Sequence, residues 1–283
     1  MDNPLRNWDY AGISSLCREL NMPAGAEGAM MDALKGVDAA KLLKEKDALR
    51  DYETGEAATR RVQDALSAVD SLKRGYIELG LSLQAALDAR AGYREAGIPD
   101  EIFLATMGCF SRFVREHKES FGRYGFDRFF WTFRQLSRGI YRIGELEFDL
   151  HCGHENALGI HIPSDARLAS CRESYRRALD FMKRFHPDFC FDRFHCHSWL
   201  LSPELKKLLD PTSHILAFQS DFTLEEMDLD SEGYKLWLFK RGDLALQDAP
   251  ENTSLQRRAK AHLLSGGKIG EAAGYIPLER ILS

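Results

Sequence analysis

Histidine and cysteine are concentrated in one stretch of this 283-residue sequence. Seven of the nine histidines lie between His151 and His214, as do four of the six cysteines. Imidazole and thiolate groups bind zinc, and imidazole also carries protons near neutral pH. The stretch therefore points to a metal site or to a site of acid–base chemistry, and the spacing of its residues has to decide between the two.

A zinc site would draw on the histidines and cysteines of one segment, namely His151, Cys152, His154, His161, Cys190, His195 and His197. A His-x-His pair on a strand can present both imidazoles to one ion, because alternate side chains share a face. The spacings match neither a zinc ribbon nor the HExxH pattern of zinc hydrolases. We therefore predict no metal, and keep a zinc-dependent hydrolase as an alternative.

The first half of the sequence has the apolar spacing of helices. Apolar residues recur every three or four positions, and no proline interrupts the run from Glu56 to Arg90. This run predicts one long helix, or two helices joined near Gly80. Proline and acidic residues at 99–101 mark another helix start.

The hydrophobic period changes near Gly139, where alternation typical of strands begins. The predicted strands are residues 143–150, 158–162, 191–201, 214–222 and 234–239, the last two as a hairpin. Helices are predicted over residues 168–185 and 254–264. The order predicts an α+β fold with two domains, a helical one over residues 1–138 and a mixed sheet domain over residues 139–283.

Four ordered strings match segments of a known protein family. They are Arg138-Gly-Ile-Tyr-Arg-Ile-Gly-Glu-Leu-Glu-Phe, Ile160-His-Ile-Pro, Phe194-His-Cys-His-Ser-Trp-Leu-Leu-Ser-Pro-Glu-Leu and Pro250-Glu-Asn-Thr-Ser-Leu-Gln-Arg. By these strings the chain resembles bacterial proteins with a helical N-acyltransferase N-terminal domain and a GNAT-like C-terminal domain. The resemblance spans most of residues 98–276.

The resemblance implies both a fold and a reaction. A GNAT core would place a strand, a phosphate loop, a helix, a second strand, another helix and a closing hairpin at residues 158–162, 163–168, 168–185, 191–200, 202–209 and 214–239. It implies an acyltransferase with acyl-coenzyme A as co-substrate. We expect an acyl group, acetyl in the first instance, to pass to an amine by direct attack in a ternary complex.

The resemblance places the pyrophosphate of coenzyme A on the loop after the second strand. Free N–H groups at a helix start bind anions, and an arginine can contact a phosphate. The expected contacts are Ile162, Pro163, Ser164, Arg167 and Leu168. The family's Gln/Arg-x-x-Gly-x-Gly/Ala signature is absent, and Asp165 would repel a phosphate. A simple capped turn therefore stays open as an alternative.

Acyl transfer to an amine needs a base for the amine proton and N–H donors for the oxyanion. Glu147, which the resemblance places near the acceptor, is one candidate base. His161, just before a strand end, is the other candidate. Ser198 lies where the parallel strands of a GNAT core splay, so we expect it to orient the acceptor or the pantetheine. A solvated carboxylate and a structural histidine remain the alternatives for the two bases.

Composition limits the partners of the chain. With 38 basic and 43 acidic residues the net charge is −5, which gives no reason to expect nucleic acid. No apolar run approaches the length that spans a bilayer, and residues 1–8 lack the apolar core of a signal peptide, so we expect a cytoplasmic protein and no membrane partner. The expected partner is a small-molecule or peptide amine, and a non-catalytic binding protein on a degenerate GNAT core remains an alternative.

Overall fold

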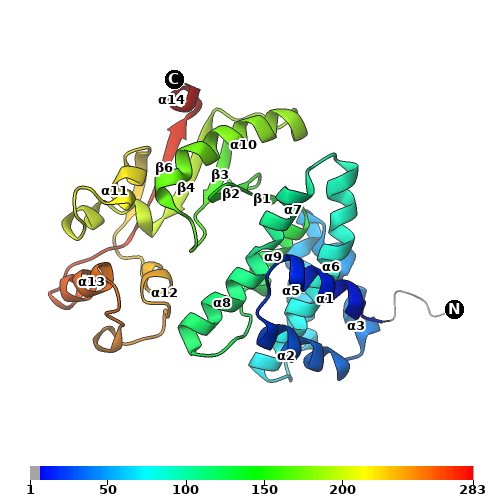
Figure 1. Ribbon diagram of the computed structural model, residues 1–283. Coiled ribbons are helices and arrows are strands. Elements are labelled where there is room, and N and C mark those ends of the chain that lie inside the picture. Colours follow the sequence, from blue (N-terminus) through cyan, green and yellow to red (C-terminus); the bar gives the residue numbers. More distant parts are fainter. Residues whose placement is uncertain (1–6, 283) are drawn as a thin grey trace. The chain divides into compact units, whose positions relative to one another are not determined.

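The computed structural model describes residues 7–282 and is shown in Figure 1. The chain divides into two compact units, with the boundary between Arg142 and Ile143. The first unit is helical and the second contains a mixed sheet with helices, so the predicted α+β class is confirmed. The predicted boundary between residues 138 and 139 remains a prediction.

The first unit is built from helices joined by short loops (Figure 1). They are α1 Tyr10–Glu19, α2 Ala24–Lys35, α3 Ala39–Leu43, α4 Lys46–Leu49, α5 Tyr52–Ala65, α6 Ser71–Glu95, α7 Asp100–Met107, α8 Cys109–Phe121 and α9 Phe129–Leu136. Helix α6 is 25 residues long, and every residue from Gly75 to Ala86 is buried. A helix buried on all sides lies at the centre of its unit, with the others packed around it.

The join predicted near Gly80 is wrong, because the chain breaks between α5 and α6 over residues 66–70. Asp70 starts α6, and its carboxylate accepts hydrogen bonds from the N–H groups of Leu72 and Lys73. Gly80 has a different role, since a Cβ there would lie 2.7 Å from Leu34 Cδ1 of α2. The glycine therefore lets two helices approach closely, and the capping aspartate marks the break.

The second unit holds most of a six-stranded sheet. The strands are β1 Ile140–Ile143, β2 Leu146–Asp149, β3 Ala157–His161, β4 Arg193–Ser198, β5 Thr223–Asp228 and β6 Glu271–Pro277. The α-helices are α10 Cys171–Phe185, α11 His214–Gln219, α12 Tyr234–Leu238, α13 Ser254–Leu264 and α14 Leu278–Leu282. Short 3-10 turns cover Leu168–Ser170, Trp199–Leu201, Pro203–Lys207 and Leu246–Asp248.

The spatial order of the strands is β1-β2-β3-β4-β6-β5. Strands β3 and β4 run parallel, connected through α10, and the pairs β2–β3, β4–β6 and β5–β6 are antiparallel. One face of the sheet is apolar and packs against α10, where the ring of Phe194 meets those of Phe148 and Tyr175. The other face carries polar side chains, among them those of Glu147, Asp149 and His195, so the two faces of the sheet differ in polarity.

The predicted hairpin over residues 214–222 and 234–239 is wrong. Most of residues 214–222 form α11, residues 234–238 form α12, and the antiparallel partner of β6 is β5. Ser213 accepts a hydrogen bond from the N–H of Ile215 as an N-cap, which favours a helix over a strand there. Every residue of β5 is exposed, so this edge strand lacks the apolar alternation by which strands are recognised.

The end of the chain holds a helix whose start can be tested. At the start of α13, Thr253 Oγ1 accepts from the N–H of Gln256, and Gln256 Oε1 accepts from the N–H of Thr253. Because this capping box satisfies two otherwise unpaired donors, Thr253→Ala should lower the free energy of unfolding by about 1 kcal/mol. Urea unfolding measures this loss. Thr253→Ser, which keeps the hydroxyl, should restore most of it, and equal stability of both variants would contradict the assignment.

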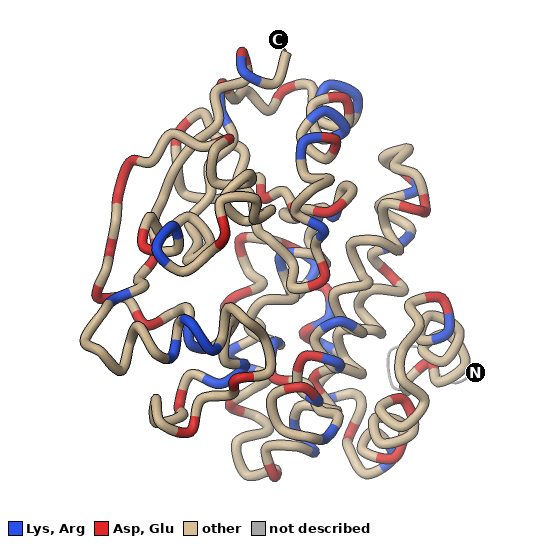
Figure 2. The backbone as a smooth tube through the Cα atoms, turned by 60° about the vertical axis from the view of Figure 1, so that its left-hand side comes forward, with Lys and Arg blue, Asp and Glu red and all other residues tan. Residues whose placement is uncertain are grey.

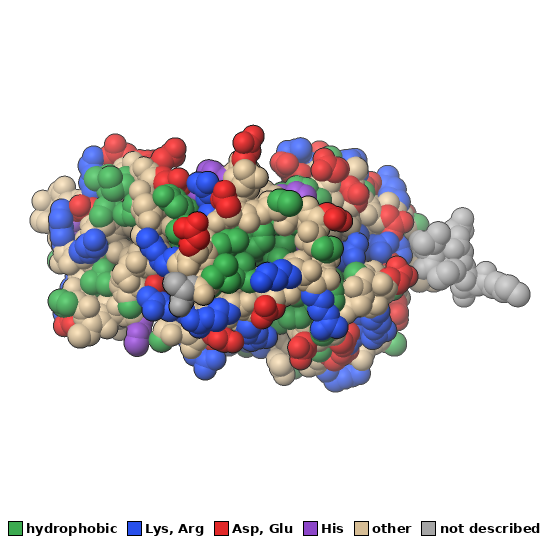
Figure 3. Space-filling model, turned by 90° about the horizontal axis from the view of Figure 1, so that it is seen from above, with side chains coloured by type: hydrophobic (Ala, Val, Ile, Leu, Met, Phe, Trp, Pro, Cys, Tyr) green, Lys and Arg blue, Asp and Glu red, His purple; other side chains and the backbone are tan. Residues whose placement is uncertain are grey.

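Charged residues of both signs are spread over both units. Lys and Arg residues are interspersed with Asp and Glu residues along the backbone (Figure 2). The surface seen from above shows the same mixture of charges (Figure 3). Within residues 7–282, no helix combines the length and the apolar character needed to cross a membrane. Residues 1–6, part of the segment in which no signal core is recognised, lie outside the described residues.

Candidate functional site

The parallel strands β3 and β4 diverge at their carboxyl ends. Their register ends at Gly159 and His195, although β3 continues to His161 and β4 continues to Ser198 alongside β6. Ligands of α/β sheets bind outside the carboxyl ends of parallel strands, where loops can reach them. The divergent ends of β3 and β4 therefore mark the candidate site.

Three polar residues share one face of the sheet at this point. Glu147 of β2 lies opposite His161 of β3, so their side chains project from the same face. Asp149, two residues further along β2, projects there too, and its Oδ2 lies 3.0 Å from His161 Nε2. Both carboxyl-bearing residues are buried, with 3% of Glu147 and 4% of Asp149 exposed. The strands thus hold a histidine against a buried carboxylate.

This arrangement suits a general base. Asp149 Oδ1 also accepts a 2.8 Å hydrogen bond from the N–H of His151, which fixes the carboxylate. A buried carboxylate beside an imidazole orients the ring and stabilises its protonated form, as a general base requires. The sequence singles out Glu147 and His161, which the structure brings together, but misses Asp149. The available signal was its position two residues after Glu147, on the same face of the strand.

Ser198 does not join this group. Alternation along β4 puts it on the face opposite to that of His195 and His197, the face that packs against α10. Its hydroxyl accepts a 3.1 Å hydrogen bond from the N–H of Leu200, at the start of the turn after the strand. Ser198 therefore has a local structural partner, and its predicted role in orienting pantetheine or acceptor remains a prediction.

Two stacked histidine rings on the polar face are not predicted from the sequence. The ring of His154 stacks on that of His195, with centroids 3.6 Å apart and planes 28° apart. Burial, with a smaller effect of the nearby His154, lowers the pKa of His195 to about 4, so its ring is neutral at neutral pH. Its Nε2 lies 3.5 Å from Glu225 Oε2 without a hydrogen bond. No spacing in the sequence shows that the turn bearing His154 folds back over β4.

The loop after β3 holds the residues predicted to contact pyrophosphate. Arg167 is exposed, but Glu145 accepts hydrogen bonds from its backbone N–H and from its guanidinium at 2.7–2.9 Å. This carboxylate also raises the pKa of Arg167. Of the other predicted contacts, Pro163 is buried, Ser164 is exposed, and Ile162 and Leu168 are half-buried. A bound phosphate would therefore compete with Glu145 for the arginine.

The histidines and cysteines do not converge on a metal site. Within residues 7–282, no group of three or more His, Cys, Asp or Glu side chains has a geometry suited to hold an ion. Cys152 Sγ donates to the carbonyl of Ala157, and burial raises the pKa of the Cys196 thiol to about 12. The zinc-dependent alternative thus has no candidate set of ligands in the described part of the chain.

Comparison with protein families gives two consecutive matches. Residues 11–138 match the N-acyltransferase N-terminal domain, and residues 140–276 match the GNAT-like C-terminal domain. The two matches follow one another along nearly the whole chain. None of the curated protein sequences compared with the chain matches it.

Several solved structures share the fold. A structure of an acyltransferase in complex with decanoyl-CoA and teicoplanin has a TM-score of 0.82 and 23% identity, covering 98% of this chain and 91% of that one. A structure of an acyltransferase variant in complex with octanoyl-CoA has a TM-score of 0.80 and 22% identity, covering 96% of this chain and 89% of that one. The likeness extends over both units.

Proposed function

Because the chain belongs to the acyltransferases that combine an N-acyltransferase N-terminal domain with a GNAT-like C-terminal domain, we propose that it transfers an acyl group from an acyl-coenzyme A to an amine. The observation that carries the proposal is the His161–Asp149 pair beside the divergent ends of two parallel strands. It supplies a positioned base at the place where the sheet can receive a ligand.

The chemistry proceeds by direct attack. The amine nitrogen forms a bond to the thioester carbonyl carbon, and one amine proton passes to the imidazole of His161. The carbon–sulfur bond then breaks to give the amide, and the leaving coenzyme A thiolate takes the proton from the His161 imidazolium, which restores the base. Asp149 stabilises the imidazolium that forms, because its buried carboxylate lies 3.0 Å from Nε2. Glu147, which projects from the same face opposite His161, is the alternative base.

We place the pantetheine between β3 and β4, beyond the last paired residues Gly159 and His195. Backbone N–H groups at such strand ends can hold the thioester oxygen as it becomes negative. Ser198 would act from the opposite face, on the pantetheine rather than on the amine. These positions are assigned by analogy with the fold and by the geometry of the strands.

The pyrophosphate should contact the loop through Arg167. Replacing Arg167 by Ala is expected to weaken coenzyme A binding by ~10-fold, because one charge-assisted hydrogen-bonding group is lost. The matched control is Arg176→Ala, which removes another exposed arginine of the same unit and should leave the affinity unchanged. Isothermal titration measures both variants. Equal affinity of the Arg167 variant and the parent would remove this residue from the site.

The acyl group and the acceptor are narrower proposals. Two of the similar structures hold decanoyl-CoA and octanoyl-CoA, so we propose a medium-length acyl group in place of the acetyl group expected from the sequence. One holds teicoplanin as well, which supports an amine on a small molecule or peptide as acceptor. All six cysteines are free thiols, which is the form expected in a reducing compartment and supports the proposed cytoplasmic location.

Isothermal titration of the full chain with coenzyme A, acetyl-CoA, octanoyl-CoA and decanoyl-CoA tests the donor. We expect binding of all four ligands, tightest for the two with medium-length chains. Absence of binding by every ligand at ~1 mM would contradict the proposal, since a donor substrate must bind at least that well. Binding without thiol release in the presence of amines would instead favour the non-catalytic binding protein.

A further inference from the structure

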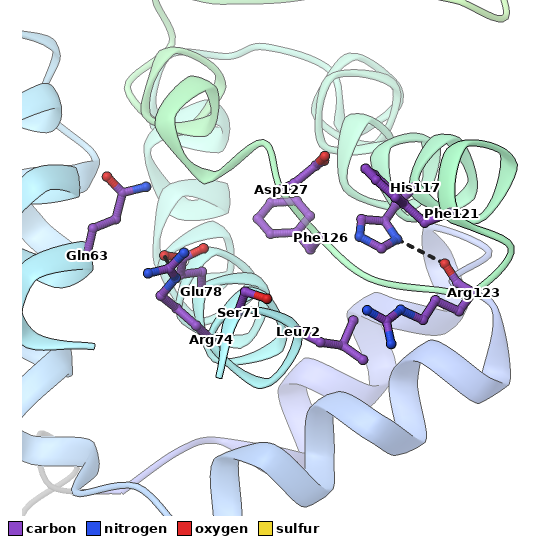
Figure 4. Close-up of a pocket in the computed structure, with 10 residues that line it drawn as sticks. All are labelled: Gln63, Ser71, Leu72, Arg74, Glu78, His117, Phe121, Arg123, Phe126 and Asp127. Atoms are coloured by element: carbon purple, nitrogen blue, oxygen red, sulfur yellow. Dashed lines mark hydrogen bonds and ion pairs between the residues drawn. The ribbon is translucent and has the colours of Figure 1, made fainter. Parts of the chain in front are cut away.

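The helical unit contains a pocket of its own, apart from the sheet. Its volume is about 290 Å3, and it lies among α5, α6, α8 and the segment 123–127 (Figure 4). Glu78 and Arg74 of α6 form one side, while Leu72 and the buried ring of Phe126 supply apolar wall. This is a space for a small molecule with both charged and apolar parts.

Glu78 is the unusual member of this pocket. It lies within the buried part of α6, its side chain is 5% exposed, and its Oε1 has no hydrogen-bond partner. Burial raises its pKa to about 7, an effect that the nearby Arg74 only partly offsets. A buried acceptor without a donor is costly, so native proteins retain such a group mainly where something else supplies the donor.

Arg74 lies one helical turn from Glu78, with Nε 4.0 Å from Oε1. Its guanidinium is partly exposed and therefore accessible from the opening of the pocket. On the far side, His117 Nδ1 is already hydrogen-bonded to the carbonyl of Arg123, so this ring nitrogen has its partner within the protein (Figure 4). Glu78 and Arg74 thus offer a ligand one acid and one base 4.0 Å apart, too far to satisfy each other by a hydrogen bond, while Arg123 and Asp127 also line the pocket.

We propose that this pocket binds a free α-amino acid with an apolar side chain. Its ammonium group would donate to Glu78, its carboxylate would accept from Arg74, and its side chain would pack on Leu72 and Phe126. An α-amino acid carries its two charged groups on adjacent carbons, which suits the 4.0 Å separation of the acid and the base. An anion alone would meet the repulsion of Glu78, and a simple amine would leave Arg74 without a partner. The proposal stands whether or not the chain transfers acyl groups.

Isothermal titration of the full chain with L-leucine and L-phenylalanine tests the proposal. Two analogues separate the charged groups: isocaproate lacks the ammonium of leucine, and L-leucinamide lacks its carboxylate. We expect binding of both amino acids, and binding of each analogue weaker by ~10-fold or more, because each loses one charge-assisted contact.

The variants Glu78→Gln and Arg74→Met should weaken the binding of the amino acids to a similar degree. Glu95→Gln, an exposed carboxylate on the same helix, is the matched control and should leave the affinity unchanged. Thermal melting checks that each variant folds. The proposal is overturned if neither amino acid binds at ~10 mM. It is also overturned if isocaproate binds as tightly as leucine, or if folded Glu78→Gln binds the amino acids as tightly as the parent.

Discussion

Replacing His161 by Gln should lower the turnover number of acyl transfer by ~10²- to 10⁴-fold, the usual contribution of a positioned general base. Gln fills a similar volume and can still donate to Asp149 Oδ2, but it cannot accept a proton at neutral pH. The Michaelis constant for the acyl-CoA should change little, because His161 would act on the amine and not on the donor. Steady-state kinetics with the best amine of a panel gives both constants.

Two further variants separate a base from a structural histidine. Asp149→Asn should produce a smaller loss, since the imidazole remains but its orientation and its charged form are no longer stabilised. His214→Gln, which changes an exposed histidine at the start of α11, should leave turnover unchanged. Turnover of the His161 variant within ~3-fold of the parent would exclude His161 as the base.

Glu78→Gln should remove a large pH dependence of stability. Burial raises the pKa of Glu78 from 4.5 to about 7 in the folded chain, with Arg74 as the opposing charge. Between these values the folded state holds a proton that the unfolded state has released, so the free energy of unfolding falls as the pH rises. The difference amounts to about 2–3 kcal/mol between pH ~5 and pH ~8.

Urea unfolding of parent and variant at several pH values measures this effect. The stability of Glu78→Gln relative to the parent should increase steadily as the pH rises, since the amide does not titrate. The same comparison with Glu95→Gln should give a constant difference, because that side chain is exposed on the same helix. A constant difference for Glu78→Gln as well would show that Glu78 ionises normally.

The parts of the fold that the sequence predicts well are those with strong local signals. Helix α13 covers Ser254–Leu264 as predicted, because Thr253 and Gln256 form a capping box and Gly266 follows the end. The parallel strands around α10 are also recognised, since both are buried and apolar on one face. Gly80 misleads, because a glycine inside a helical run can mark close packing as well as a break.

The β5–β6 edge of the sheet could not be predicted, because its strands lack strong local signals. Every residue of β5 is exposed, including the apolar Leu224 and Met227, and β6 contains the consecutive small residues Ala272, Ala273 and Gly274, so neither shows the alternation of a half-buried strand. More than forty residues separate the two strands, which pair only because the chain returns to the sheet after α13. Pairing over such a distance has no local signature.

The candidate site is predictable only as far as strand alternation reaches. The sequence analysis selects Glu147 and His161 as candidates, and the cross-strand register shows that their side chains share one face of the sheet. The contact of His161 with Asp149 depends on that register, and the stacking of His154 on His195 depends on the path of a turn. Such contacts come from tertiary structure and are invisible to spacing along one strand.

Product analysis tests directly whether the chain transfers an acyl group to an amine. The full chain is incubated with decanoyl-CoA and a panel of primary amines, and the mixture is analysed by mass spectrometry for amides and by thiol titration for coenzyme A. We expect a decanoyl amide in an amount equal to the free thiol released, and at least ~10²-fold less of both products in the same time with the His161→Gln variant. Unchanged thioester with every amine, together with no binding of decanoyl-CoA or coenzyme A, would contradict acyl transfer by this chain.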